Sequence, residues 1–143
     1  MLIGSYLGNL SEKRRVAVPK KFLSELGESP IIAKWYEDCL ILVSSGFWES
    51  LFERLTGGRK AIGYGIRNIE RFILGSAFEV EPDDQGRIIV PEILAEYAGL
   101  ERELVFAGLR DRIEIWPKDA WDTRSSELAK TTKEYIENLA NEK

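Results

Sequence analysis

Histidine is absent from this 143-residue chain, and cysteine occurs once, at Cys39. The chain therefore lacks the side chain that most often serves as general base or metal ligand near neutral pH. A lone cysteine can form neither an intrachain disulfide nor a zinc site, and no histidine is present to activate it as a nucleophile. We expect no catalytic residue, no metal ion, no cofactor and a reducing compartment.

Long apolar runs are also missing. The run over Cys39–Val43 is far too short to span a membrane, and no positive charge precedes an apolar run within the first ten residues. We therefore expect no signal peptide and no membrane association. We also expect no small-molecule substrate, because the usual catalytic residues are missing. Hydrophobic residues make up 44% of the chain and charged residues 31%, as in an ordinary soluble globule, which favours a cytoplasmic location.

Two local patterns bear on enzymatic chemistry. Residues 58–63 begin like a phosphate-binding loop, but Tyr64 and Gly65 follow where such a loop needs lysine and serine or threonine. Asp83 and Asp84 are adjacent carboxylates, and adjacent side chains on a strand or turn point apart. These patterns argue against an enzyme, although a hydrolase that uses carboxylates alone stays open as an alternative.

What the chain does contain is a tandem duplication. Residues 15–27 (RVAVPKKFLSELG) and 87–99 (RIIVPEILAEYAG) both give an arginine, a β-branched strand, a proline, an amphipathic helix and a glycine. The correspondence extends well beyond these segments, to Tyr6 with Phe78, Asp38 with Asp111, and Trp48 with Trp121. We expect two related repeats, 1–72 and 73–143, that pack as one compact unit.

Each repeat is predicted to contain about four strands and several helices. Alternating or β-branched runs predict strands over 2–9, 15–18, 31–36 and 39–43, and over 75–81, 87–90, 103–107 and 112–116. Proline before and glycine after an apolar stripe predict helices over 19–27 and 91–99. Apolar residues at helical spacing predict further core-facing helices over 46–56, 66–74 and 117–140.

The formal net charge of −4 hides an asymmetry between the repeats. Residues 1–72 hold 11 Lys and Arg against 8 Asp and Glu, whereas residues 73–143 hold 9 against 16. Five positive charges fall within nine residues of the first repeat, at Lys13, Arg14, Arg15, Lys20 and Lys21. Because local potential rather than total charge attracts a polyanion, the first repeat is the candidate nucleic-acid surface.

An Asp-x-x-Gly-Arg element, Asp83-Asp84-Gln85-Gly86-Arg87, leads into the second copy of the duplicated segment. In such a turn the aspartate accepts backbone N–H bonds, and the glycine adopts positive φ without steric cost. Together with the following Ile-Ile-Val-Pro, the Leu74-Gly75-Ser76-Ala77 segment and the duplication itself, this element resembles the MraZ family. MraZ proteins are bacterial transcription regulators related to the AbrB and MazE swapped-hairpin folds.

The resemblance implies a mainly β fold with peripheral α-helices (α+β). It would be a tandem-duplicated, AbrB/MazE-like double-split β-barrel with pseudo-twofold symmetry. The resemblance also implies a ring-shaped homo-oligomer that binds double-stranded DNA, at direct repeats upstream of the division and cell-wall gene cluster, in the nucleoid. In this family the Asp-x-x-Gly-Arg element is associated with DNA contact, and it corresponds here to Asp83, Gly86 and Arg87.

The first repeat keeps only the arginine of this element, since Ser11, Arg14 and Arg15 stand at the matching positions. Arg14 would cost about 1 kcal/mol if its φ had to be positive. Acidic neighbours in the second repeat favour an ion pair to Arg87, so we assign that repeat mainly to turn structure and subunit packing. The DNA contacts are therefore assigned to Lys13, Arg14, Arg15, Lys20 and Lys21, with Arg87 as a lesser candidate.

Readout would then come from a β-hairpin rather than a recognition helix. The alternative is an antitoxin-like interaction module that caps a protein partner, because MazE-like folds also have that role.

Overall fold

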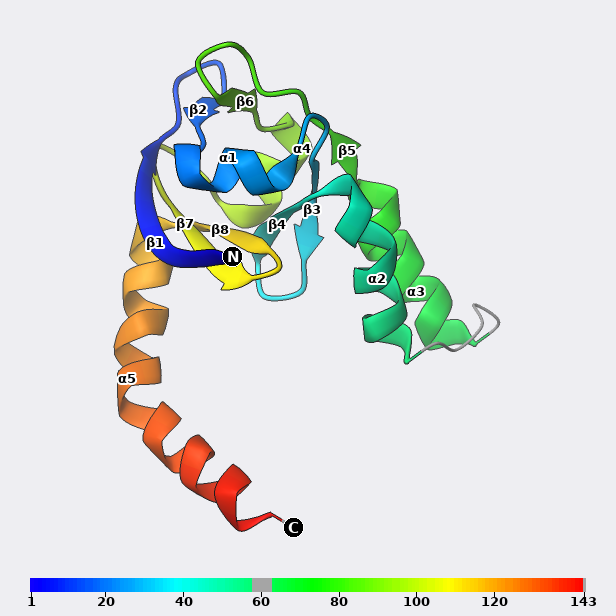
Figure 1. Ribbon diagram of the computed structural model, residues 1–143, viewed down its shortest axis with the longest axis vertical. Helices are drawn as coiled ribbons and strands as arrows, with labels where there is room; N and C mark the ends of the chain where they lie inside the picture. The colour runs from blue at the N-terminus through cyan, green and yellow to red at the C-terminus, as the bar shows by residue number, and fades with distance from the viewer. Residues whose placement is uncertain (58–62, 143) are drawn as a thin grey trace.

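The computed structural model describes residues 1–57 and 63–142, and its strands form two antiparallel sheets (Figure 1). The larger sheet has the order β1-β7-β8-β4-β3-β5, and the smaller pairs β2 with β6. The strands are β1 (Leu2–Asn9), β2 (Arg15–Ala17), β3 (Ile31–Trp35), β4 (Cys39–Val43), β5 (Phe78–Glu79), β6 (Arg87–Ile89), β7 (Glu103–Arg110) and β8 (Ile113–Pro117).

The strand order is symmetrical when the strands are numbered by repeat. β1 to β4 of the first repeat correspond in order to β5 to β8 of the second. β4 and β8 pair at the centre of the sheet. β1 lies at one edge beside β7, and β5 lies at the other edge beside β3. The α+β class is therefore confirmed, but helices occupy more of the chain than a mainly β fold implies. α5 alone spans 24 residues.

The two faces of the large sheet bury different sets of side chains. On β4, Leu40 and Leu42 join one apolar cluster, whereas Cys39 and Ile41 join a second cluster. This division follows from the alternation of side chains along a strand. The first cluster is covered by α1 (Lys20–Leu26), α4 (Glu92–Ala98) and the β2–β6 pair, as Figure 1 shows.

The second cluster is covered by α2 (Ser45–Thr56), α3 (Tyr64–Ile73) and the start of α5 (Lys118–Asn141). α2 and α3 lie side by side, with Leu51 and Ile73 buried between them and the sheet. Within the described ranges, none of the helices is long and apolar enough to cross a membrane.

The predicted strand over 75–81 is wrong in extent. Leu74–Ser76 forms a 3₁₀ helix, and only β5 is extended. The reason is the Ser76 hydroxyl, which donates to the Ile73 carbonyl at 2.9 Å and accepts the Lys34 backbone N–H at 3.0 Å. A side chain thus takes the hydrogen bond that a longer strand would have made with β3.

The core-facing stripe predicted for the last helix is also wrong over most of its length. Trp121 packs against Trp116, with ring centroids 6.0 Å apart. Beyond it, α5 leaves the body of the protein (Figure 1), and its later apolar residues are exposed, namely Leu128, Tyr135, Ile136 and Leu139. The phosphate-loop-like segment lies outside the described residues, apart from Gly63.

Candidate nucleic-acid interface

The first repeat's cationic segment forms a tight turn between β1 and β2. The Ser11 and Arg15 backbones bond to each other at 2.9 Å, and the Arg14 N–H donates to the Ser11 carbonyl at 2.9 Å. The Ser11 hydroxyl accepts the Arg15 N–H at 3.1 Å. Serine therefore keeps one of the turn bonds expected of aspartate.

The second repeat builds the same backbone turn with a carboxylate at its centre. Asp83 Oδ1 accepts the N–H groups of Gln85 and Arg87, each at 2.9 Å, and Asp83 Oδ2 accepts Arg87 Nε at 2.9 Å. These bonds to the charged form, the Arg87 N–H first among them, hold the pKa of Asp83 below its ordinary value. The predicted ion pair between Arg87 and a neighbouring carboxylate is confirmed.

Both turns place one residue in the left-handed region. Gly86 has φ +76° and Arg14 has φ +60°, so Arg14 does occupy a conformation that favours glycine, at a cost of about 1 kcal/mol. A bond from Arg14 Nε to the Val90 carbonyl, at 3.0 Å, offsets part of this cost. Arg14 is half-buried, and its side chain ties the first turn to the second repeat.

The two turns lie together because β2 pairs with β6. Arg15 is opposite Ile89, and Ala17 is opposite Arg87. The intervening Val16 and Ile88 are buried in the core. The remaining four side chains therefore share the outer face of a two-stranded ribbon, which Figure 1 shows at the end of the molecule away from the tip of α5.

A groove of about 530 Å³ runs over this ribbon and the first turn. Lys13, Arg15 and Arg87 line it, together with Ser11 and other residues, namely Asn9, Glu12 and Ala17. Lys13 and Arg15 form no ion pair with any residue in the described ranges. The groove thus joins cations from both repeats.

The other two predicted cations lie outside this groove, on α1. Lys20 and Lys21 are exposed in the first turn of that helix. Lys21 Nζ lies 5.3 Å from the centroid of the Tyr6 ring, a cation–π contact that leaves its charge at the surface. The structure therefore places Lys13 and Arg15 together in the groove, and it places Lys20 and Lys21 outside the groove on α1.

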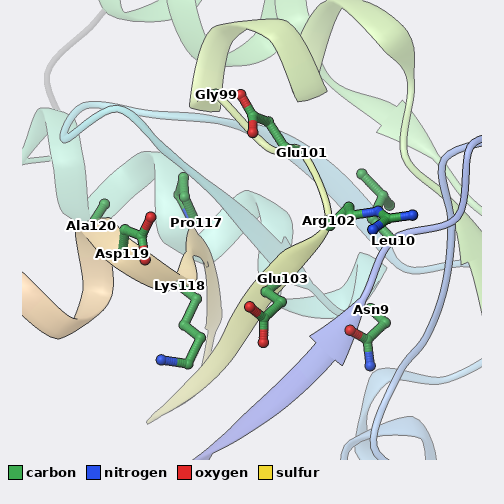
Figure 2. Close-up of a pocket in the computed structure, with 10 residues that line it drawn as sticks. All are labelled: Asn9, Leu10, Gly99, Glu101, Arg102, Glu103, Pro117, Lys118, Asp119 and Ala120. Atoms are coloured by element: carbon green, nitrogen blue, oxygen red, sulfur yellow. The ribbon is translucent and has the colours of Figure 1, made fainter.

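A second hollow, of about 830 Å³, adjoins the first at Asn9 but has a different character. Figure 2 shows Glu101, Glu103 and Asp119 around it together with Arg102 and Lys118. Lys118 is bonded to Asp122 at 2.7 Å. Mixed charges of this kind do not favour a polyanion, so the basic groove is the better candidate interface.

Of the residues considered for catalysis, Asp83 and Cys39 have structural roles. Asp83 holds its turn, as described above. Burial, together with Glu114 and Glu37, raises the pKa of the Cys39 thiol, so it stays protonated near neutral pH. Neither residue is arranged as a nucleophile or general base.

No local pattern indicates directly that Arg87 lines the same groove as Lys13 and Arg15. That outcome depends on β2 pairing with β6, a contact between segments 72 residues apart. Ala17 and Ile89 were missed for the same reason. The available signal was the shared Arg-x-x-Val pattern, whose alternation places the arginine and the third residue on one face.

These features define a class: an internally duplicated protein with an antiparallel sheet and a cationic ribbon assembled from both repeats. A family model described as "MraZ protein, putative antitoxin-like" matches residues 73–140. Three proteins named "Transcriptional regulator MraZ" are similar over most of their length. Those from Caldanaerobacter subterraneus subsp. tengcongensis and Leuconostoc mesenteroides subsp. mesenteroides are 36% and 38% identical, each over 99% of this chain and 98% of the relative. The protein from Clostridium acetobutylicum is 39% identical over 85% and 84%.

The chain belongs to the MraZ family. This finding confirms the resemblance identified from the duplication and the Asp-x-x-Gly-Arg element.

Proposed function

We propose that this protein is a sequence-specific, DNA-binding transcriptional regulator and not an enzyme. The observation that carries the proposal is the groove that joins Lys13, Arg15 and Arg87 on an exposed two-stranded ribbon. The names of the relatives support the regulatory role. A two-stranded ribbon fits the major groove of B-DNA, where guanine presents two acceptors to an arginine.

In this proposal the cations have different tasks. Lys13, Lys20 and Lys21, all exposed, neutralise phosphates and supply affinity without sequence preference. Arg15 reads a base edge, because its guanidinium is not held by a carboxylate. Arg14 stays in the interface with only part of its guanidinium free, since its Nε is bonded to Val90.

Assembly into a ring completes the proposal. A single small cationic ribbon binds weakly, whereas several ribbons on one ring gain on the order of 10²–10⁴ in avidity when DNA repeats match their spacing. Exposed apolar side chains on α5 and on the β1 edge, among them Tyr135, Ile136 and Leu7, offer surface for packing between copies. Each subunit of the ring is one chain that contains both repeats, 1–72 and 73–143.

The expected target is a set of direct repeats upstream of the division and cell-wall gene cluster. The protein would then act in the cytoplasm at the nucleoid. Double-stranded DNA and further copies of the chain are its partners, without a membrane or a small-molecule substrate.

The test is binding of the purified full-length protein to the DNA upstream of its own gene, measured by fluorescence anisotropy. Light scattering of the same sample gives the assembly mass. We expect tight binding to that duplex, weak binding to a shuffled duplex of equal length, and an affinity that falls steeply with salt. Equal affinity for both duplexes at every salt concentration would contradict the proposal.

The description of the matching family model favours a second candidate, an antitoxin-like module that caps a protein partner. Affinity purification of the tagged protein from its native host distinguishes the two. A stoichiometric protein partner, with no DNA retained and no upstream duplex bound, would support the second candidate.

A further inference from the structure

The outer face of the β2–β6 ribbon carries two arginines on one diagonal and two apolar residues on the other. Arg15 lies directly opposite Ile89, and Arg87 lies directly opposite Ala17. Side chains of directly opposed residues have Cβ atoms about 5 Å apart. The ribbon therefore presents one apolar residue directly opposite each arginine.

The two apolar positions correspond between the repeats but differ in size. Ala17 and Ile89 each stand two residues after their arginine, and both are exposed. Ile89 exposes 49% of its surface although its neighbour Ile88 is buried. The packing of the ribbon onto the core thus leaves the Ile89 side chain available to whatever the arginines bind.

We propose that Ile89 is a specificity-determining residue that packs against the C5-methyl group of a thymine. The inference rests on the proposed function. The arginines on the same face make DNA the occupant that charge favours, and the thymine methyl is the apolar group that DNA offers in its major groove. A Cβ separation of about 5 Å from Arg15 is between one and two base-pair steps of about 3.4 Å, so the element read is a guanine with a thymine in a neighbouring base pair.

The repeats then differ in what they read. The first repeat contributes Arg15, and the second contributes Ile89 opposite it, so one reading unit is built across the ribbon from both repeats. In the other cross-strand pair, Arg87 is bonded to Asp83, and the residue opposite it, Ala17, has a single methyl group. We therefore expect the Arg87–Ala17 pair to contribute less to sequence recognition than the Arg15–Ile89 pair.

The experiment begins by selecting a duplex with the full-length protein from a pool of random duplexes. Each thymine of the selected duplex is then replaced singly by uracil, which removes only the methyl group and keeps the base pair. We expect one replacement to weaken binding by the wild-type protein about fourfold, the effect of one buried carbon. Ile89→Ala should bind the thymine and uracil duplexes equally.

A matched control is Ile93→Ala, since Ile93 is 57% exposed but lies on α4 outside the ribbon. It should keep the thymine preference. If no uracil replacement affects the wild type, or if Ile89→Ala keeps the preference, the inference is wrong while DNA binding stands. If Ile89→Ala instead changes the assembly mass and keeps the preference, Ile89 contacts another copy. If no duplex is selected, the proposed function and this inference both fail.

Discussion

The turn at residues 11–15 and the turn at residues 83–87 have the same backbone and different chemistry. In the second turn, one carboxylate takes up two backbone N–H groups and one guanidinium. In the first, a hydroxyl accepts a single N–H, and the neighbouring cations have no carboxylate partner among the described residues. The same backbone turn can therefore be kept while its charged groups change from bonding within the turn to facing the surface.

The largest effect expected from a single change is on DNA affinity. Arg15→Ala removes the guanidinium that we assign to a base edge and should weaken binding to the upstream duplex about 5- to 150-fold, since one bidentate pair contributes about 1–3 kcal/mol of discrimination. Arg102→Ala is the control, because Arg102 lies in the neighbouring hollow of mixed charge. Anisotropy titrations of both variants check this. Equal affinities would remove Arg15 from the interface.

The next largest effect is expected on the stability of the fold, from changes at the residue with positive φ in each turn. A Cβ at Gly86 would lie 2.6 Å from Leu23 Cδ1, at φ +76°, so Gly86→Ala should lower the free energy of unfolding by about 1–2 kcal/mol. At the matching position, Arg14→Gly relieves strain but loses the bond to Val90, so the net change should stay within about 1 kcal/mol.

Urea unfolding curves of these two variants give the comparison directly. A Gly86→Ala protein as stable as the wild type would mean that the second turn does not require glycine. A large loss for Arg14→Gly would mean that the Arg14 side chain holds the ribbon together.

The second turn should also make the stability of the protein depend on pH. The folded-state pKa of Asp83 is depressed by its bonds to Arg87, so its contribution to stability is fully present above the ordinary pKa of 3.8 and is lost as pH falls below it. Asp83→Ser places a serine at the position in the second turn that matches Ser11 in the first turn. It should be less stable than the wild type at pH 7, and the difference should shrink below pH 3.8.

Thermal unfolding measured from pH 7 to pH 3 tests this prediction, with Asp84→Ser as the control, since the Asp84 side chain makes no hydrogen bond to the turn in the described part of the chain. A difference that stays constant with pH would show that the ionised carboxylate is not what stabilises the turn.

The smallest effect is expected at Lys13. Lys13→Ala removes one phosphate contact, so it should weaken all duplexes equally and reduce the slope of log affinity against log salt by about one. A salt titration of the variant and the wild type measures both slopes. A change in sequence preference without a change in slope would assign Lys13 to base readout instead.

Much of the fold followed from local patterns. The proline and glycine punctuation located α1 and α4, and the alternation of apolar residues located β3, β4 and β8 within about one residue. The strand expected over 75–81 failed, because a hydrogen bond from a distant residue to the Ser76 hydroxyl replaces strand pairing there. Local propensity contains no information about such a partner.

The candidate interface was predicted in part. The cationic turn was evident from the sequence, and so was the departure of Ser11 and Arg14 from the element in the second repeat. The ribbon that adds Arg87 and Ile89 was not evident, because it depends on pairing between segments far apart in the chain. The position of α5 beyond Trp121 was not predicted either, since an apolar stripe does not show whether it packs within one chain or between copies.

DNA binding by the cations of the first turn is the proposal on which the others depend. Its most direct test is the affinity of the double variant Lys13→Gln with Arg15→Gln for the upstream duplex. The comparison is Lys130→Gln with Lys133→Gln, which removes the same charge from the exposed part of α5. We predict that the first variant binds this duplex no better than a shuffled one, while the second binds like the wild type. Equal, specific binding by both variants would contradict the claim.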